Sequence, residues 1–157
     1  MICLSDEALK YFKLFRDPFK SPFDVQKDQD IYMSEDHRYI EAAMLDGEAQ
    51  GWRAGEPGRQ VIRLLFASPQ PLRRIWLRFA EPSLERTQEF VLRWSPDAGQ
   101  SFREIVRQQW NFSPPNTIRE IEEYQLGISD ITVLELIITP EVSHGTARAS
   151  IKSIRLR

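Results

Sequence analysis

The densest group of side chains able to bind a polar ligand lies between residues 107 and 116. An aromatic face can stack on the apolar side of a sugar ring, while Arg, Gln and Asn donate hydrogen bonds to its hydroxyl groups. The same groups could stack a nucleobase and contact a phosphate, as in single-strand nucleic-acid binders. The alternative, which the pattern favours, is that Trp110 and Phe112 are core residues, because they are two apart on one strand. The segment reads Arg107-Gln108-Gln109-Trp110-Asn111-Phe112-Ser113-Pro114-Pro115-Asn116.

We predict that this segment and one later loop residue form a carbohydrate-binding site. His144 lies next to Gly145 between the last two predicted strands, where it could line a site or be merely exposed. The predicted ligand-binding residues are Arg107, Gln109, Trp110, Asn111, Asn116 and His144.

The sequence gives little support for catalysis. His37 and His144 lie in separate polar segments, and the chain has neither a Gly-x-Ser-x-Gly motif nor a phosphate-binding glycine loop. Glu120 and Glu122 could act as a glycosidase pair only at a separation that the sequence does not define. We interpret Glu120-Ile121-Glu122-Glu123 as a solvated strand edge instead. The chain is therefore predicted not to be an enzyme, with a glycan hydrolase as the least favoured alternative.

Composition limits the class of protein. The 157 residues, 41% of them apolar, suffice for one domain with a real core. The net charge of −2 provides no overall field that would attract nucleic acid or an anionic membrane. The single cysteine, Cys3, cannot form an internal disulfide, and no Cys/His set has zinc spacing. Charged residues within Met1 to Leu14 argue against a signal peptide or a membrane span, so we expect a cytoplasmic protein.

The elements that would position these groups are strands. From Arg59 onward apolar residues alternate with polar ones, and Pro, Gly, Asn and Asp separate the runs. Turns are expected at Ser68-Pro69-Gln70-Pro71 and at Ser95-Pro96-Asp97-Ala98-Gly99. This spacing predicts an all-β fold, an antiparallel β-sandwich or jelly roll. The expected strands are 59–66, 72–79, 87–94, 102–112, 118–126, 132–139 and 148–156.

A short N-terminal extension precedes the strands. Ser5 can cap a helix in which Leu9, Phe12 and Phe15 recur at helical spacing, and Pro18 should end it. We predict that residues 1–44 form a helical and loop extension packed on a sandwich of residues 45–157. Its phenylalanines make a homo-oligomer through this extension plausible.

Several segments, taken in order, resemble a known family. They are the Asp46-Gly47 turn followed by Trp52, the strand Leu72–Leu77, the hairpin Trp94–Phe102 and two final strands, 133–140 and 149–156. Together they resemble discoidin-like domains, the coagulation factor 5/8 type C or galactose-binding-like group, over residues 45–157.

The resemblance implies a jelly-roll sandwich that binds glycans, lipids or proteins through loops at one end. It also implies a structural calcium ion near the Asp-Gly turn in many members. Lys152 and Arg155 stand in the final strand where glycan-binding members often have a carboxylate. We therefore predict no metal and no cofactor, with calcium as an alternative.

Two functions remain from different classes. A non-catalytic carbohydrate-binding module is the main prediction, and it requires an exposed aromatic side chain beside Arg and Asn in the end loops. A protein-interaction or scaffold domain is the alternative, and it requires an apolar patch on a sheet face, around Trp76 and the N-terminal phenylalanines. The expected partner is a glycan or a protein, and neither nucleic acid nor a membrane is expected.

Overall fold

The computed structural model describes residues 12–13, 30–31 and 51–157 of the chain. No helix among them is long and apolar enough to cross a membrane. Within these residues the chain forms strands β1 (Phe12–Lys13), β2 (Asp30–Ile31), β3 (Trp52–Pro57), β4 (Gln60–Ala80), β5 (Arg86–Ser95), β6 (Arg103–Phe112), β7 (Arg119–Thr139), β8 (Arg148–Ile151) and β9 (Ser153–Leu156).

The strands form one large sheet and one small sheet. In the large sheet the order is β1-β4-β7-β5-β6, and β2 and β9 also pair with β4. The small sheet pairs β3 with β8. Every pair of named strands is antiparallel apart from β2 with β4. The predicted all-β antiparallel sandwich is confirmed.

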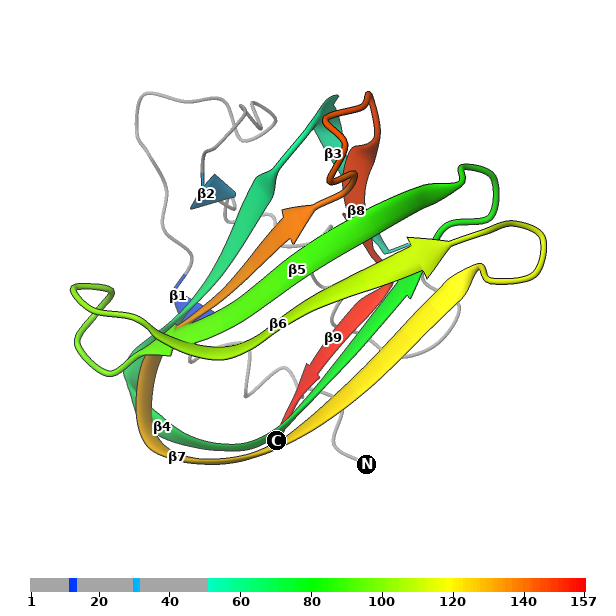
Figure 1. Cartoon of the computed structure of the whole chain (residues 1–157). Coiled ribbons are helices and arrows are strands. Elements are labelled where there is room, and N and C mark those ends of the chain that lie inside the picture. Colours follow the sequence, from blue (N-terminus) through cyan, green and yellow to red (C-terminus); the bar gives the residue numbers. More distant parts are fainter. Residues whose placement is uncertain (1–11, 14–29, 32–50) are drawn as a thin grey trace.

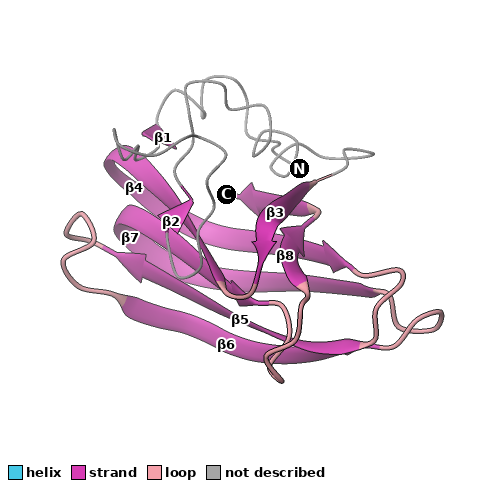
Figure 2. Ribbon diagram, turned by 90° about the horizontal axis from the view of Figure 1, so that it is seen from above, coloured by secondary structure: helices cyan, strands magenta, loops and turns pink. Residues whose placement is uncertain are grey.

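Two long strands connect the layers of the sandwich. Figure 1 shows β4 and β7 curving together from one layer to the other, so that one sheet supplies both faces of the core. The β5–β6 layer contains β6, β5 and the halves of β7 and β4 that pair with them, and Figure 2 shows these four strands side by side. The β9 layer contains β9, Leu72–Ala80 of β4 and Arg119–Ile128 of β7.

The bend lies where the sequence predicts a turn. The pairing of β4 with β7 shifts register between Leu65 and Arg74 but continues through Gln70 and Leu72, which lie opposite Ile131 and Ile128. Irregularities of this kind bend and twist a strand without ending it. The predicted turn at 68–71 is therefore a bulged bend inside β4. The predicted strands 118–126 and 132–139 are likewise the two halves of β7.

The core fills the space between the two layers. Alternate residues of each strand point inward, as the two-residue period requires. Phe79 of the β9 layer stacks on Phe90 of the β5–β6 layer, with 5.3 Å between ring centroids. The largest fully buried side chains are Phe79, Phe90, Phe112, Ile62, Leu64, Ile75, Leu77, Leu92, Ile131, Ile138, Ile151 and Ile154.

The start of the sandwich agrees in part with its prediction. Trp52 is buried and lies opposite Ile151 in the β3–β8 pair. Trp94 is half-buried against the core, and the Arg103 guanidinium lies 5.1 Å from the centroid of its ring. The Asp46-Gly47 turn lies outside the described residues.

Two predictions about the chain ends need correction. Phe12 and Lys13, where the sequence predicts helix, form a strand opposite Phe66 and Leu65, because β4 offers them a backbone edge to pair with. The remainder of the predicted helical extension lies outside the described residues. The predicted strand 148–156 is divided at Lys152, whose N–H donates to the Arg78 carbonyl at 2.7 Å, so β8 and β9 belong to different sheets.

Candidate functional site

The predicted binding residues of β6 lie on its two opposite faces. Arg107 is exposed on the outer face and donates to Glu89 at 3.0 Å and to Glu104 at 3.2 Å. Gln109 shares that face and donates to Glu89 at 3.1 Å. Trp110 points inward and packs, half-buried, against the core. Strand alternation therefore separates Trp110 from the polar groups with which it was predicted to act.

The other predicted residues lie toward the end of the layer where β6 finishes. Asn111 Oδ1 accepts from Thr87 Oγ1 at 2.7 Å. Asn116 is exposed in a turn, where its N–H donates to the Ser113 carbonyl at 3.1 Å. His144 is exposed with a φ of 61° in the loop after β7. That loop is joined to β5, because the Val142 N–H donates to the Thr87 carbonyl at 3.0 Å. A shared ligand pocket for all six residues does not follow from this placement.

Sequence reasoning missed an inverted strand at the start of β7. Glu120 lies opposite Phe79, and Glu122 lies opposite Leu77, so both carboxylates point toward the core face. Ile121 lies opposite Arg78 on the outer face and is 66% exposed, whereas Glu120 is 1% exposed. The interpretation of Glu120 as part of a solvated edge is therefore wrong. Phe79 and Leu77 are buried in the core. Residues directly opposite one another in paired strands point to the same face, so this register places Glu120 and Glu122 on the core face of β7.

Gln108 joins these carboxylates to the opposite layer. Its Nε2 donates to Glu120 Oε1 at 3.4 Å and to Glu122 Oε1, and its Oε1 accepts from the Tyr124 hydroxyl at 3.1 Å. Among the described residues β6 has no backbone pairing with β7, so these side-chain bonds cross between two sheet edges. We call Gln108, Glu120, Glu122 and Tyr124 the interlayer polar cluster.

The cluster shifts the ionisation of its acids. Burial raises the pKa of Glu120 to about 7, and the charge of Glu122 adds to this. The Gln108 hydrogen bond, the Arg86 charge and the Gln88 amide act in the opposite direction. Burial, followed by the charges of both glutamates, also raises the pKa of Tyr124.

Three buried polar atoms of this region have no hydrogen-bond partner among the described residues. They are Gln88 Nε2, Trp110 Nε1 and Glu120 Oε2. Gln88 and Trp110 lie opposite one another on β5 and β6. The Gln88 amide is close enough to influence the Glu120 carboxylate but lies outside hydrogen-bonding geometry. Unpaired buried groups are rare in native proteins, so this region differs chemically from the rest of the core.

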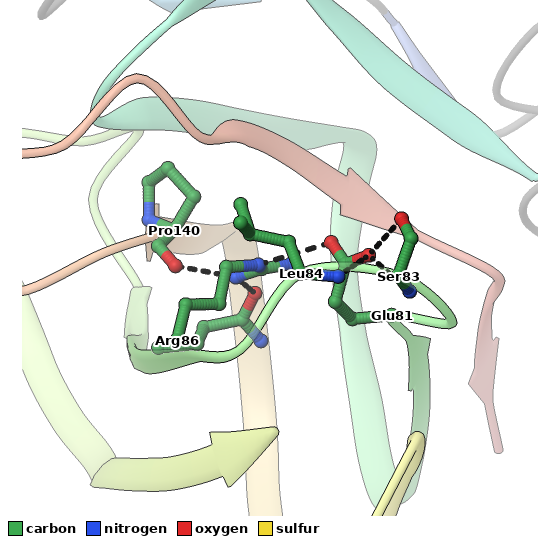
Figure 3. Close-up of polar contacts among 6 residues, drawn as sticks. Glu81, Ser83, Leu84, Arg86 and Pro140 are labelled. Atoms are coloured by element: carbon green, nitrogen blue, oxygen red, sulfur yellow. Dashed lines mark hydrogen bonds and ion pairs between the residues drawn. The ribbon is translucent and has the colours of Figure 1, made fainter. Parts of the chain in front are cut away.

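Arg86 is the buried cation nearest to this cluster, and Figure 3 shows its partners. Its Nε donates to Glu81 Oε2 at 3.1 Å, and its Nη1 donates to Gln88 Oε1 at 3.0 Å and to the Pro140 carbonyl. The guanidinium also lies 5.0 Å from the centroid of the Phe112 ring. Arg86 thus ties the β4–β5 loop to the end of β7.

The Glu81 carboxylate is held by the loop that follows it. Its Oε1 accepts from the Ser83 N–H, the Ser83 hydroxyl and the Leu84 N–H, each at 3.1 Å (Figure 3). Burial alone would raise its pKa, but these backbone bonds and Arg86 together keep the pKa of Glu81 below its usual value. The arrangement is that of a structural anchor, because the charge of each partner is already satisfied.

A third buried carboxylate lies on the outer face of the β5–β6 layer. Glu135 is 0% exposed and lies between Arg63 and Arg93, its direct neighbours on β4 and β5. It accepts from Arg63 Nε at 2.5 Å and from Arg93. Both guanidinium groups lie over the Phe102 ring, at 5.7 and 4.4 Å from its centroid. These arginines therefore have structural partners.

Among the described residues no three His, Cys, Asp or Glu side chains are placed to hold a metal ion. The architecture defines the class of this protein, an antiparallel β-sandwich. The chain is similar to the N-terminal domain of the single-strand break repair protein XRCC1, with a TM-score of 0.54 and 9% sequence identity over 77% of this chain and 86% of that chain. At this identity the likeness shows the fold alone. No family model and no curated protein matches the chain, so its resemblance to discoidin-like domains stays a prediction.

Proposed function

We propose that this protein is a protein-interaction module that binds its partner through the outer face of the β9 layer, around Ile121. The single observation that carries the proposal is the inverted start of β7. There an isoleucine is 66% exposed while the glutamate before it is 1% exposed. Burying an isoleucine side chain is worth about 1.5–3 kcal/mol. A partner that covers Ile121 would gain the part of this energy that the isolated fold leaves in water.

The side chains around Ile121 suit such a contact. Arg78 lies directly opposite it on β4, and half-buried Trp76 lies opposite Glu123 on the same face. Arg74 reaches Glu123 in an exposed ion pair at 3.4 Å. An apolar centre with Arg and Trp around it is the composition of many binding hot spots. The scaffold alternative expects an apolar patch on a sheet face around Trp76, and Ile121 lies on this face.

The carbohydrate function becomes the second candidate. It requires an exposed aromatic ring in the end loops, but the exposed large apolar side chains of the described residues are Leu84, Ile121 and Val142. Trp110 faces inward, away from Arg107 and Gln109. The similar solved structure is a domain of a repair protein, which adds no support for glycan binding.

Photo-cross-linking from a single position tests the proposal. A photoreactive residue at position 121 should yield discrete protein adducts in a cell extract, whereas one at Gln109, on the outer face of the other layer, should not. Excess wild-type protein should compete for these adducts, and the Ile121→Asp variant should not. Equal competition by both proteins, with both folded by circular dichroism, would remove this surface from consideration. A glycan-array signal that survives Ile121→Asp would favour the carbohydrate function.

A further inference from the structure

Two glutamates of β7 share one hydrogen-bond donor between the layers of the sandwich. Gln108 Nε2 donates to both Glu120 Oε1 and Glu122 Oε1, and the second oxygen of Glu120 accepts no hydrogen bond from the described residues. We propose that Glu120, beside the carboxylate of Glu122, is a proton-binding site whose proton keeps β6 closed onto β7.

The geometry requires that these two acids interact. They are two residues apart on one strand, so both side chains leave the same face. Like charges at this spacing disfavour ionisation of both groups at once. Glu120 is the member that carries the proton, because it is 1% exposed and its Oε2 receives no hydrogen bond from the described residues.

The charges that face Glu120 come from two strands, β5 and β7. On β5, Arg86 favours the ionised form, but its Nε is bonded to Glu81 of the preceding loop. On β7 itself, Glu122 opposes ionisation, and Tyr124 donates its hydroxyl to Gln108 and not to Glu120. The inward residues of β6, Gln108 and Trp110, are uncharged, and those of β4, Leu77 and Phe79, are apolar. Among the described residues, the single cation near Glu120 and Glu122 is therefore Arg86, which is already bonded to Glu81.

Loss of the Glu120 proton to water would weaken the contact between β6 and β7. Two carboxylates would then compete for the Gln108 amide, and the buried charge of Glu120 would be only partly compensated by Gln88 and Arg86, which is costly. Among the described residues, the side-chain hydrogen bonds between β6 and β7 all run through Gln108. We therefore expect β6 to separate transiently from β7 as the pH rises, while it remains paired with β5. Proton binding would control access to this side of the core.

Nuclear magnetic resonance of the whole chain tests the proposal. The Glu120 carboxyl carbon should titrate near neutral pH, since burial and Glu122 raise the pKa of Glu120 to about 7 from an ordinary 4.5. Solvent exchange of the Gln108 amide and Trp110 indole protons, corrected for base catalysis, reports opening. It should rise by up to about tenfold per pH unit between those two values and then level off.

Three variants separate this mechanism from general destabilisation. Glu120→Gln should make the exchange independent of pH. Glu122→Gln should lower the titration midpoint of Glu120, and it serves as the test if Glu120→Gln does not fold. Glu123→Gln, on the outer face of the same strand, should change nothing. The proposal is overturned if Glu120 titrates at its ordinary value, or if backbone amides between β5 and β7 open with the same pH dependence.

Discussion

Single buried polar side chains contribute strongly to the stability of this sandwich. Arg86 is 5% exposed and bonded to Glu81, Gln88 and the Pro140 carbonyl. Arg107 makes ion pairs of similar length, to Glu89 and Glu104, but its side chain is 54% exposed. In water the partners of an exposed pair are resolvated when it is broken, whereas a buried partner is left without compensation. Burial, and not the number of bonds, therefore makes Arg86 more important than Arg107 for the free energy of unfolding.

Replacing Arg86 by Met should lower the free energy of unfolding by about 3–5 kcal/mol, because Glu81 would remain buried without its cation. The matched change Arg107→Met should cost less than about 1 kcal/mol. Urea unfolding at neutral pH measures both values. Similar losses for the two variants would show that burial does not distinguish these ion pairs.

Trp110 offers a test of its role as a core residue. Trp110→Ala should destabilise the protein by on the order of 3 kcal/mol, since it removes a ring that packs on the core. Trp110→Phe keeps most of that packing and removes Nε1, a buried donor with no partner among the described residues. We therefore expect a change below about 1 kcal/mol for Phe. A large loss for Phe would mean that the indole N–H has a partner such as buried water.

At the scale of elements, turns and glycines position the strands. The β5–β6 turn was predicted from its sequence, and its bonds explain why it forms. Ser95 Oγ donates to Asp97 Oδ1 at 2.6 Å and accepts from the Gly99 N–H at 2.8 Å. Asp97 also accepts from the Ser101 N–H at 2.8 Å and from its hydroxyl at 2.5 Å. One ionised carboxylate thus organises the whole turn.

The ionisation of Asp97 should affect stability in acid. Hydrogen bonds from the side chains of Ser101 and Ser95, in that order, lower its pKa from 3.8 to about 2. A carboxyl whose pKa is lower in the folded state stabilises the fold above its unfolded value. Its contribution should therefore be complete above pH 3.8 and lost as the pH falls towards about 2. Carboxyl-carbon titration should give this midpoint, and Asp97→Asn should remove the corresponding part of the acid dependence.

Two glycines provide a matched test of the backbone. Gly51 has a φ of 75°, and an added Cβ would lie 2.4 Å from the Ile151 carbonyl oxygen. Nothing lies within 4 Å of a Cβ added at Gly127. Gly51→Ala should cost more than about 1 kcal/mol, and Gly127→Ala should be neutral or slightly stabilising. Thermal unfolding of both variants checks this, and equal midpoints would contradict the close approach of β3 to β8.

The strand pattern was predictable because alternation depends only on neighbouring residues, and the predicted segments from residue 59 onward all contain strand. The joining of two predicted strands into β4 was not predictable, because Pro69 and Pro71 are typical of a turn. Only the pairing with β7 shows that β4 continues past these prolines. The separation of Trp110 from Arg107 follows from the same local alternation and was therefore predictable, although the two residues are close in sequence. The inversion at Glu120 depends on register with Phe79, which is 41 residues away in sequence, so no local pattern reveals it.

At the scale of the whole molecule, the two layers are not separate units. β4 and β7 each contribute one half to the β5–β6 layer and the other half to the β9 layer (Figure 1). The core side chains of both layers belong to one contiguous cluster. Both proposals also meet on one strand, because β7 presents Ile121 outward and the two glutamates inward. A partner bound at Ile121 would therefore contact the same strand that contains the proton-binding site.

Because β4 and β7 belong to both layers, neither layer can unfold without disrupting the other. We therefore expect a single cooperative unfolding transition. The four tryptophans report on different parts of the described fold: Trp52 on β3, Trp76 on the β9 layer, and Trp94 and Trp110 on the β5–β6 layer. With 5-fluorotryptophan incorporated, all four fluorine resonances should disappear at the same urea concentration. An earlier midpoint for Trp94 and Trp110 than for Trp76 would show that the layers unfold separately. In that case β4 and β7 would bend at 67–73 and 127–131 as hinges between two independent sheets.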